Sequence, residues 1–465
     1  MKKYFILFVF ISLFKFELNA QEKSSRLPNI VFILADDLGY GDLGCYGQKL
    51  IRTPNIDALA KSGMRFTDFY AGSTVCAPSR ASLMTGQHTG KTYIRGNGEL
   101  PLRAGDSIIP QYLKQKGYVN GMVGKWGLGL QNTEGVPEKK GWDYFVGHLH
   151  HVEGHYQKSD SIWKMIEGES KKVPLPKGTF LNEMFTESAT DFIQQNKNNL
   201  FFLYVSYTLP HAELVVQEKY LKSYQDKNSN SIFAPETEHP SGKHYGPQEQ
   251  PKAAYAAMIT AMDDYVGRIM KELKASGLEN NTLVIFASDN GTHTEGGRSK
   301  ADAIDFFKSS GQFRGTKRDL YEGGIRIPFI AKWPGMINPN SVSNHVGAFW
   351  DVLPTFAQIT GLNLNQDDGI SFLPVLKNQS VKEQHEYLYW EFYENGFKQA
   401  VRKDSWKAIR FYKDSKPHHT ELYNLSEDES EQKDVSKSMP GKVKELELRM
   451  DKAHTESESK LFQIK

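Results

Sequence analysis

Two apolar runs, each ending abruptly in two polar residues, constrain the fold more than any other feature of the sequence. Residues 29–35 (NIVFILA) are followed at once by two aspartates, and residues 282–288 (TLVIFAS) by an aspartate and an asparagine. Continuous apolar runs of this length are typical of strands that are buried on both faces of a parallel sheet. The carboxyl ends of such strands are where this architecture binds ligands. We therefore expect a polar site at one edge of a buried sheet.

Strand and helix patterns alternate along most of the chain. A third apolar run, residues 200–207, ends close to His211, and weaker strand patterns occur at residues 118–123 and 325–331. Helix patterns with terminal capping signals or three- and four-residue apolar spacing occur at residues 54–61, 254–276 and 350–360. The alternation predicts an α/β fold with a large, mostly parallel sheet sandwiched by helices.

The pattern changes after about residue 363. Short strand-like pieces occur at residues 386–392, 398–403, 406–412 and 421–425, and a charged helix pattern follows at residues 442–454. We predict a large N-terminal domain over residues 21–365 and a smaller antiparallel α+β domain over residues 366–465, packed on the first. The polar stretches 159–178 and 226–250 predict surface loops.

The N-terminus has the features of an export signal. Lys2 and Lys3 precede an apolar segment at residues 4–14, and the tripeptide at residues 18–20 fits a cleavage site. The apolar segment is short for a permanent membrane span, although an uncleaved anchor is the alternative. We expect a signal peptide at residues 1–20, a periplasmic or secreted protein, and no stable membrane insertion after cleavage.

The charge content limits the classes of binding partner that we expect, and the cysteine content limits the number of disulfides. The chain has 57 Lys and Arg residues against 55 Asp and Glu residues. This balance leaves no basic field, so nucleic acid is not an expected partner. The two cysteines, Cys45 and Cys76, could form one disulfide in an exported protein.

The polar residues after the two apolar runs suggest a metal site. Each pair alone could be explained as turn formers or helix caps. If they converge, the carboxylates repel one another unless a cation lies among them. An all-oxygen set suits a hard cation such as Ca²⁺ rather than zinc, and the chain has no HExxH or paired-cysteine pattern. The expected ligands are Asp36, Asp37, Asp289 and Asn290.

The most specific motif is C-x-P-S-R within residues 73–86 (STVCAPSRASLMTG). This segment resembles the signature of the formylglycine-dependent sulfatases of the alkaline phosphatase superfamily. Four more segments resemble parts of that family, in family order: residues 36–42 (DDLGYGD), 124–126 (GKW), 288–291 (SDNG) and 321–324 (YEGG). The resemblance extends from about residue 28 to the end of the chain.

The resemblance implies a mechanism of sulfate-ester hydrolysis. A maturase would oxidise Cys76 to formylglycine, whose hydrate attacks sulfur with one oxygen and later expels sulfate with the other. The modified Cys76 would also join the four oxygen ligands in holding calcium. Arg80, one helical turn after Cys76, would hold the modified side chain and the metal shell. Lys125 and Lys317 would bind sulfate, and His211 would donate a proton to the leaving sugar.

One position departs from the family pattern. Many sulfatases carry a histidine two residues after the first lysine, where this chain has Gly127. Four histidines lie nearby in sequence, at positions His148, His150, His151 and His155. We predict that one of them, above all His150 or His151, lines the pocket and replaces the missing base or binds sugar. The alternative is a polar surface loop.

The sequence thus predicts an exported calcium-dependent sulfatase. The G-K-W-G-L-G segment resembles a polysaccharide-acting branch, which suggests a sulfated carbohydrate containing galactose or N-acetylgalactosamine. One alternative is a phosphonate or phosphodiester hydrolase that uses formylglycine. Another is a non-catalytic glycan-binding protein on the same scaffold, which the retained Cys76, Arg80 and His211 disfavour.

Overall fold

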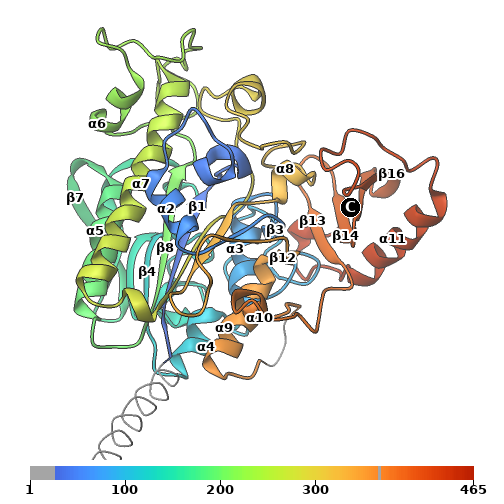
Figure 1. The fold of residues 1–465 in the computed structure, drawn as a ribbon, viewed down its shortest axis with the longest axis horizontal. Helices are drawn as coiled ribbons and strands as arrows, with labels where there is room; N and C mark the ends of the chain where they lie inside the picture. Colours follow the sequence, from blue (N-terminus) through green and yellow to red (C-terminus); the bar gives the residue numbers. More distant parts are fainter. Residues whose placement is uncertain (1–26, 365–367, 465) are drawn as a thin grey trace, which may run out of the picture.

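A large ten-stranded sheet with helices on both faces lies beside a small four-stranded sheet (Figure 1). The computed structural model describes residues 27–364 and 368–464. The strand order of the large sheet is β11-β2-β10-β9-β1-β8-β4-β5-β6-β7. Its five central strands are parallel: β9 (Thr282–Ser288), β1 (Asn29–Asp36), β8 (Phe201–Pro210), β4 (Val119–Lys125) and β5 (Tyr144–His148). The predicted fold class is confirmed.

Strand pairs that are mostly antiparallel complete both edges of this sheet, and only β11 pairs in parallel, with β2. One edge is formed by β10 (Phe329–Lys332), β2 (Met64–Phe66) and β11 (Ser341–Ser343), and the other by β6 (Lys158–Ile166) and β7 (Glu169–Phe180). The prediction of a surface loop at residues 159–178 is therefore wrong. Polar composition indicated exposure, but an edge hairpin satisfies its backbone by cross-strand pairing and can carry polar side chains. Residues 226–250 contain only isolated bridges, as expected for a loop.

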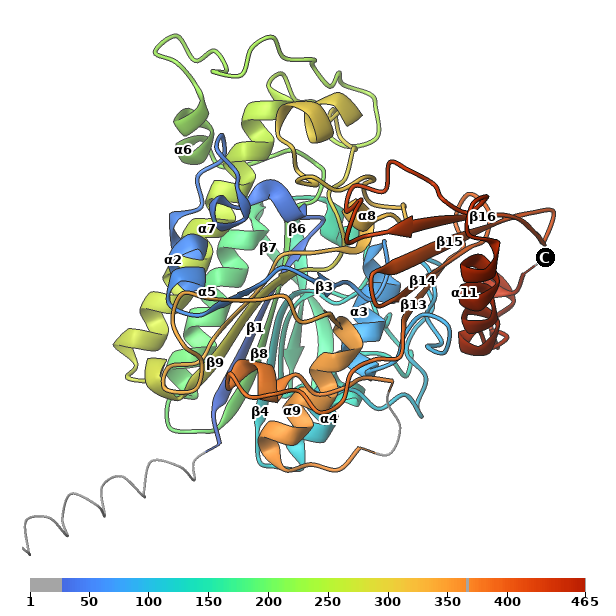
Figure 2. The same cartoon turned by 45° about the vertical axis from the view of Figure 1, so that its right-hand side comes forward.

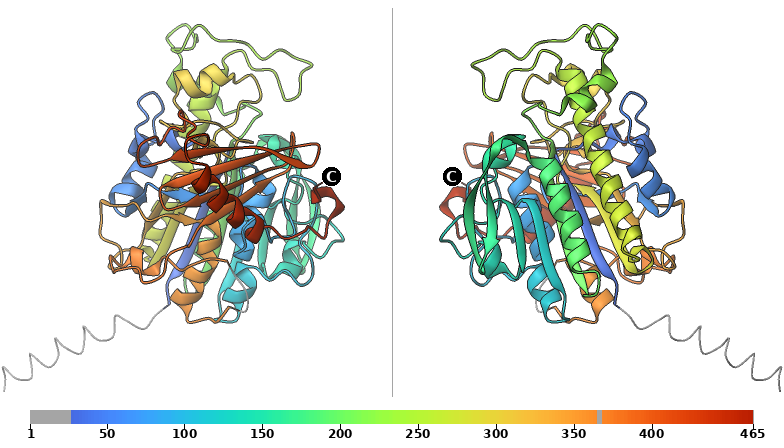
Figure 3. Two further views of the ribbon diagram at one scale, coloured as in Figure 1. Left: turned by 90° about the vertical axis from the view of Figure 1, so that its right-hand side faces the viewer. Right: turned by 90° about the vertical axis from the view of Figure 1, so that its left-hand side faces the viewer.

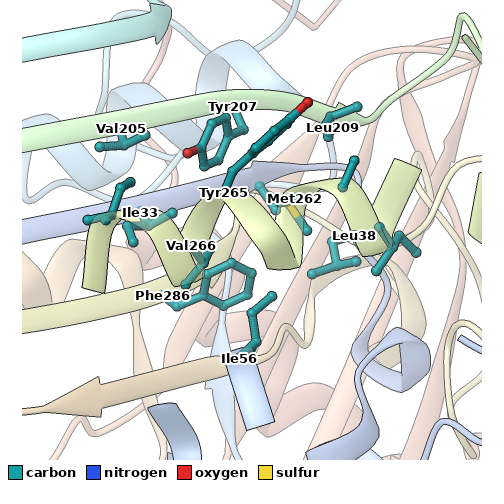
Figure 4. Close-up of a cluster of buried hydrophobic side chains, with 14 of the residues drawn as sticks. Ile33, Leu38, Ile56, Val205, Tyr207, Leu209, Met262, Tyr265, Val266 and Phe286 are labelled. Carbon is teal, nitrogen blue, oxygen red and sulfur yellow. The ribbon is translucent and has the colours of Figure 1, made fainter. Parts of the chain in front are cut away.

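Alternating residues of β1 explain why helices cover both faces of the large sheet. Val31, Ile33 and Ala35 pack with α2 (Pro54–Lys61), α5 (Leu181–Gln195) and α7 (Pro251–Ala275). Ile30, Phe32 and Leu34 pack with α3 (Cys76–Thr85), α4 (Ile109–Lys114) and α9 (Val352–Thr360). Figures 2 and 3 show these layers, and Figure 4 shows α7 side chains against β1, β8 and β9. Because successive side chains of β1 point to opposite faces of the sheet, each face is covered by its own layer of helices.

Several short elements connect these layers. They are α6 (Glu218–Leu221), α8 (Glu322–Ile325), α10 (Leu373–Leu376) and a two-stranded sheet of β3 (Phe69–Tyr70) and β12 (Gly347–Ala348). The strand pattern expected at residues 325–331 begins later than predicted, because Ile325 ends α8 and β10 starts at Phe329.

The small C-terminal sheet packs on the large unit through one face and on a helix through the other. It is the meander β13 (Leu388–Phe392), β14 (Lys398–Lys403), β15 (Trp406–Lys413) and β16 (Lys416–Asn424), followed by α11 (Pro440–Ala453). Trp390 packs with Tyr70 and Trp350 of the large unit, whereas its neighbour Tyr389 packs with Leu446 of α11. The predicted antiparallel α+β unit is confirmed.

Two predictions concern residues that the structure does not describe. The signal peptide at residues 1–20 lies outside the described residues, and the domain boundary between residues 365 and 366 falls in the second gap. Both stay predictions. Across residues 27–364 and 368–464, no helix combines the length and the apolarity that a bilayer crossing needs.

Candidate active site

The carboxyl ends of the central parallel strands meet at one edge of the sheet, as the two apolar runs predicted. Asp36 ends β1, Lys125 ends β4, and Asp289 directly follows β9. The backbone N–H of Asp37 donates to Asp289 Oδ1 at 3.0 Å, although the two residues are 252 positions apart. Asp36, Asp37, Asp289 and Asn290 are all completely buried.

Cys76 is the first residue of α3 and lies in the centre of this group. Its Sγ is 3.3 Å from Asp36 Oδ1. The Sγ and one carboxylate oxygen each of Asp36 and Asp289 all lie within 4.8 Å of one another. Burial, reinforced by the charge of Asp36, raises the pKa of the Cys76 thiol well above its ordinary value. Cys76 and Cys45 are both free thiols, so the disulfide that composition allowed does not form.

Arg80 lies one turn along α3 from Cys76 and joins three strand ends. Its Nε and Nη2 donate to Asp289 Oδ2 at 3.0 and 2.7 Å, and Nη2 is 3.6 Å from Asp36 Oδ1. Nη1 donates to the Lys125 carbonyl oxygen at 3.1 Å. Arg80 is buried away from water. These contacts therefore take the place of solvent in balancing the positive charge of its guanidinium.

Two buried lysines reach the carboxylates from opposite sides. Lys125 Nζ is 2.7 Å from Asp36 Oδ2, and Lys317 Nζ is 2.8 Å from Asp37 Oδ2. Burial raises the pKa of Asp36, but Lys125 and its other cationic neighbours outweigh it and hold that pKa well below its ordinary value. Burial and the charge of Asp36 raise the pKa of Asp289 to about 7. The group therefore brings two ammonium groups and several carboxylates together in one buried place.

His211 follows β8 and contacts one of these lysines. Its Nε2 lies 3.0 Å from Lys317 Nζ and 3.4 Å from Asp37 Oδ2. Its Nδ1 contacts the Ala212 carbonyl oxygen, which assigns the hydrogen to Nδ1 when the ring is neutral. Burial and the charge of Lys317 hold the pKa of His211 well below its ordinary value.

The oxygen atoms of the group fit a hard cation. Asn290 Nδ2 donates to Asp37 Oδ1 at 2.7 Å, whereas Asn290 Oδ1 is buried and has no hydrogen-bond partner among the described residues. A buried acceptor of this kind needs a partner. Three carboxylates and one amide oxygen are the donor set that Ca²⁺ prefers. The residues that sequence reasoning assigned to calcium therefore lie together and match its chemistry.

The four clustered histidines occupy different places. His151 is mostly buried and faces Gly127, and burial with the charge of Lys125 lowers the pKa of His151 to about 3. His150 stacks on His151 and places Nε2 3.0 Å from Glu99 Oε1, nearer the surface. The ring of His155 stacks on His211 with centroids 4.0 Å apart. His148 ends β5 beside Lys125.

Sequence reasoning missed three residues that contact the site. Ser206 Oγ donates to the Lys125 carbonyl oxygen at 2.7 Å and accepts from Arg80. Tyr245, from the 226–250 loop, donates to Glu295 Oε2 at 3.1 Å, and that oxygen lies 4.0 Å from His211 Nε2. None belongs to a motif. Glu295 could have been found only by its closeness in sequence to Asn290.

The chain is similar to known proteins over most of its length. Residues 28–362 match the family model described as Sulfatase, and residues 311–459 match N-sulphoglucosamine sulphohydrolase, C-terminal. The chain is 30% identical to N-acetylgalactosamine-6-sulfatase of Mus musculus over 78% of this chain and 68% of that protein. It is 28% identical to steryl-sulfatase of Homo sapiens over 84% of this chain and 77% of that protein.

A solved structure extends the similarity to three dimensions. The crystal structure of Ps i-CgsB in complex with k-i-k-neocarrahexaose has a TM-score of 0.73 and 27% sequence identity, and covers 92% of each chain. The matched length includes both the large sheet and the small C-terminal sheet.

Proposed function

The chain belongs to the sulfatase family and is a sulfuric ester hydrolase, and on this premise we propose that its substrate is a sulfated carbohydrate. The relative from Mus musculus is named for N-acetylgalactosamine 6-sulfate, and the Ps i-CgsB structure holds a neocarrahexaose. Both names support galactose or N-acetylgalactosamine units as the sulfated sugar.

The observation that carries the proposed chemistry is the position of Cys76. Its side chain lies among carboxylates and two ammonium groups, where a sulfate group could meet Lys125 and Lys317. The raised pKa of the thiol keeps it protonated, which makes it a weak nucleophile. We therefore propose that a maturase converts Cys76 to formylglycine, whose hydrate supplies a hydroxyl nucleophile for the sulfur atom.

Calcium is the second cofactor of the proposal. Asp36, Asp37, Asp289 and Asn290, with the modified residue 76, would hold it, and the bound ion would neutralise sulfate oxygens. Arg80 keeps Asp289 and Asp36 in place, because its guanidinium contacts both. Their fixed positions orient the side chain of residue 76 toward the sulfur atom.

Four side chains would complete the reaction. Lys125 and Lys317 present ammonium groups to the sulfate. His211 Nε2 lies 3.0 Å from Lys317 Nζ, and we assign to His211 the proton that the leaving sugar oxygen takes up. His151 lies beside Gly127 and is the candidate for the base that helps to expel sulfate.

Sulfate release from a panel of defined sulfated sugars tests the proposal. We expect turnover of N-acetylgalactosamine or galactose sulfates and none in the Cys76→Ala protein. Faster turnover of phosphonates or phosphodiesters than of every sulfate ester would contradict it.

Export is part of the same proposal, because a sulfated polysaccharide would be met outside the cell. We propose that residues 1–20 are removed and that the mature protein begins at Gln21. N-terminal sequencing of the protein recovered from the periplasm or the medium tests this, and a mature chain that retains Met1 would contradict it.

A further inference from the structure

A second cavity lies next to the active site, at the same edge of the sheet. It has a volume of about 240 Å³, below the roughly 300–1,000 Å³ of pockets for drug-sized ligands, so it suits a single sugar unit. We propose that it binds a second, sulfated sugar unit of the substrate, beside the unit that loses its sulfate; this inference rests on the proposed function. The cavity is lined by His148, Glu153, Tyr156, Lys158, Ser159, Ser161, Trp163 and Lys172.

Three consecutive residues separate this cavity from the catalytic groups. Glu153 lines the cavity, and the ring of His155 stacks on His211 at 4.0 Å. Between them, Gly154 lies so close to Lys125 that a Cβ on it would be 3.0 Å from Lys125 Cδ. One turn of 3₁₀ helix, Glu153–His155, therefore contacts the cavity at one end and His211 at the other. Neighbouring units of one carbohydrate chain can occupy both.

The lining matches an anionic sugar. Trp163 and Tyr156 line the cavity with aromatic side chains, which can pack against the apolar C–H groups of a sugar, and Lys172 Nζ lies 5.7 Å from the centroid of the Trp163 ring. Lys172 Nζ is 3.0 Å from Glu153 Oε1, and Trp163 Nε1 donates to Glu153 Oε2 at 3.2 Å. Lys158 has no carboxylate within ion-pair distance among the described residues, and its ammonium lies 4.4 Å from the Phe180 ring. Two lysines against one glutamate leave a net positive charge for a sulfate group.

The edge hairpin positions these side chains. Trp163 of β6 pairs directly with Lys172 of β7, so the two project from the same face. The register shifts between Ser159 and Ser161, and both residues line the cavity. Lys171, the neighbour of Lys172, instead contacts Glu167 at the hairpin turn. The hairpin thus offers a matched control, because charges can be removed from it inside or outside the cavity.

The test is saccharide binding to the Cys76→Ala protein, measured by calorimetry. The probes are N-acetylgalactosamine 6-sulfate, a chondroitin 6-sulfate tetrasaccharide and the same tetrasaccharide without sulfate. All cavity variants are made on the Cys76→Ala background. One variant carries both Lys158→Gln and Lys172→Gln. Two others carry a single change, Trp163→Ala or the more conservative Trp163→Phe. The control removes the same charge outside the cavity, by Lys171→Gln with Lys177→Gln. Thermal unfolding checks that every variant is folded.

We expect the paired lysine variant to weaken tetrasaccharide binding about tenfold and monosaccharide binding by less than about twofold. Trp163→Ala should act in the same direction, and Trp163→Phe should restore much of the affinity. The desulfated tetrasaccharide should bind the paired variant and its parent equally. Unchanged tetrasaccharide binding in both cavity variants, or equal losses in the Lys171/Lys177 control, overturns the subsite alone. If neither sulfated saccharide binds the Cys76→Ala protein, the proposed carbohydrate substrate fails and the subsite fails with it.

Discussion

His151 occupies the space in front of Gly127: a Cβ built on Gly127 would lie 3.4 Å from the Cβ of His151. Gly127 has a φ of +73°, a conformation that favours glycine over residues with a side chain. The imidazole at this place therefore belongs to His151, in the segment after β5, and not to position 127, which follows β4.

This relationship leads to the first prediction. His151→Ala should lower kcat by about 10²-fold or more, because general bases contribute roughly 10²–10⁴-fold to a rate. His150→Ala is the matched control, since His150 stacks on His151 but contacts Glu99. A rise in KM alone would assign His151 to sugar binding. If His148, His150, His151 and His155 can each be replaced by alanine without effect on kcat or KM, the base lies elsewhere.

Cys76 should be found as formylglycine in active protein. Mass spectrometry of the peptide that spans residues 73–86 measures the modification, and Cys76→Ala should remove turnover while the protein stays folded. Cys45→Ala serves as the control, because Cys45 is the other free thiol and lies outside the site. Full activity in protein whose Cys76 is an unmodified thiol would contradict this prediction.

Calcium should stabilise the protein as well as support its activity. Binding to the folded state alone raises the free energy of unfolding by about 2.7 kcal/mol at a hundredfold excess over Kd. Asn290→Ala should weaken calcium binding, measured by calorimetry, because Asn290 Oδ1 loses its place in the ligand set. Asn120→Ala removes a buried amide that bonds Pro110 and Gly141 instead, and should leave calcium affinity unchanged. A Tm that is the same with calcium and with chelator would refute the metal site.

Removing the guanidinium of Arg80 should destabilise the protein. Arg80→Met leaves Asp289 buried without its ion-pair partner, and such losses cost about 3–5 kcal/mol. Arg268→Met removes a half-exposed pair with Glu183, where about 0–1 kcal/mol is expected. Urea unfolding of both variants gives the comparison. Equal losses would show that Arg80 is not held by charge pairing.

Acid should destabilise the fold between about pH 6.5 and pH 4, in part through His88. Burial lowers the pKa of His88 to about 4, whereas an unfolded histidine titrates near 6.5. In this window the unfolded chain therefore binds a proton that the folded chain excludes. The contribution of His88 to the free energy of unfolding is complete above pH 6.5 and falls by up to about 1.4 kcal/mol per pH unit as the pH drops.

Replacing His88 tests this sign directly. His88→Gln should flatten the dependence of unfolding free energy on pH in this window, and His418→Gln, at an exposed histidine, should not. A slope that is identical in all three proteins would show that His88 does not contribute.

The sequence by itself determined the central sheet and the chemistry of its edge. Continuous apolar runs predict buried strands because burial on both faces needs no alternation, and polar residues placed directly after them must lie at the strand ends. The same local signals set α2, which begins at Pro54 after Thr53 and ends at Lys61 as predicted. The convergence of Asp36, Asp37, Asp289 and Asn290 was predictable because each directly follows or ends one of these strands, whereas their role as metal ligands stays a prediction.

Only the tertiary structure decided which distant side chains meet. The β6–β7 hairpin was not predicted, since a polar edge strand is stabilised by pairing with a neighbour rather than by its own composition. The approach of His151 to Gly127 depends on two different strand connections, and the stacking of His155 on His211 joins the connection that holds His151 to the segment after β8. Local propensity contains no information on such contacts, because they depend on how parallel strands are ordered in the sheet. That order, with β4 between β8 and β5, places the second cavity beside Lys125.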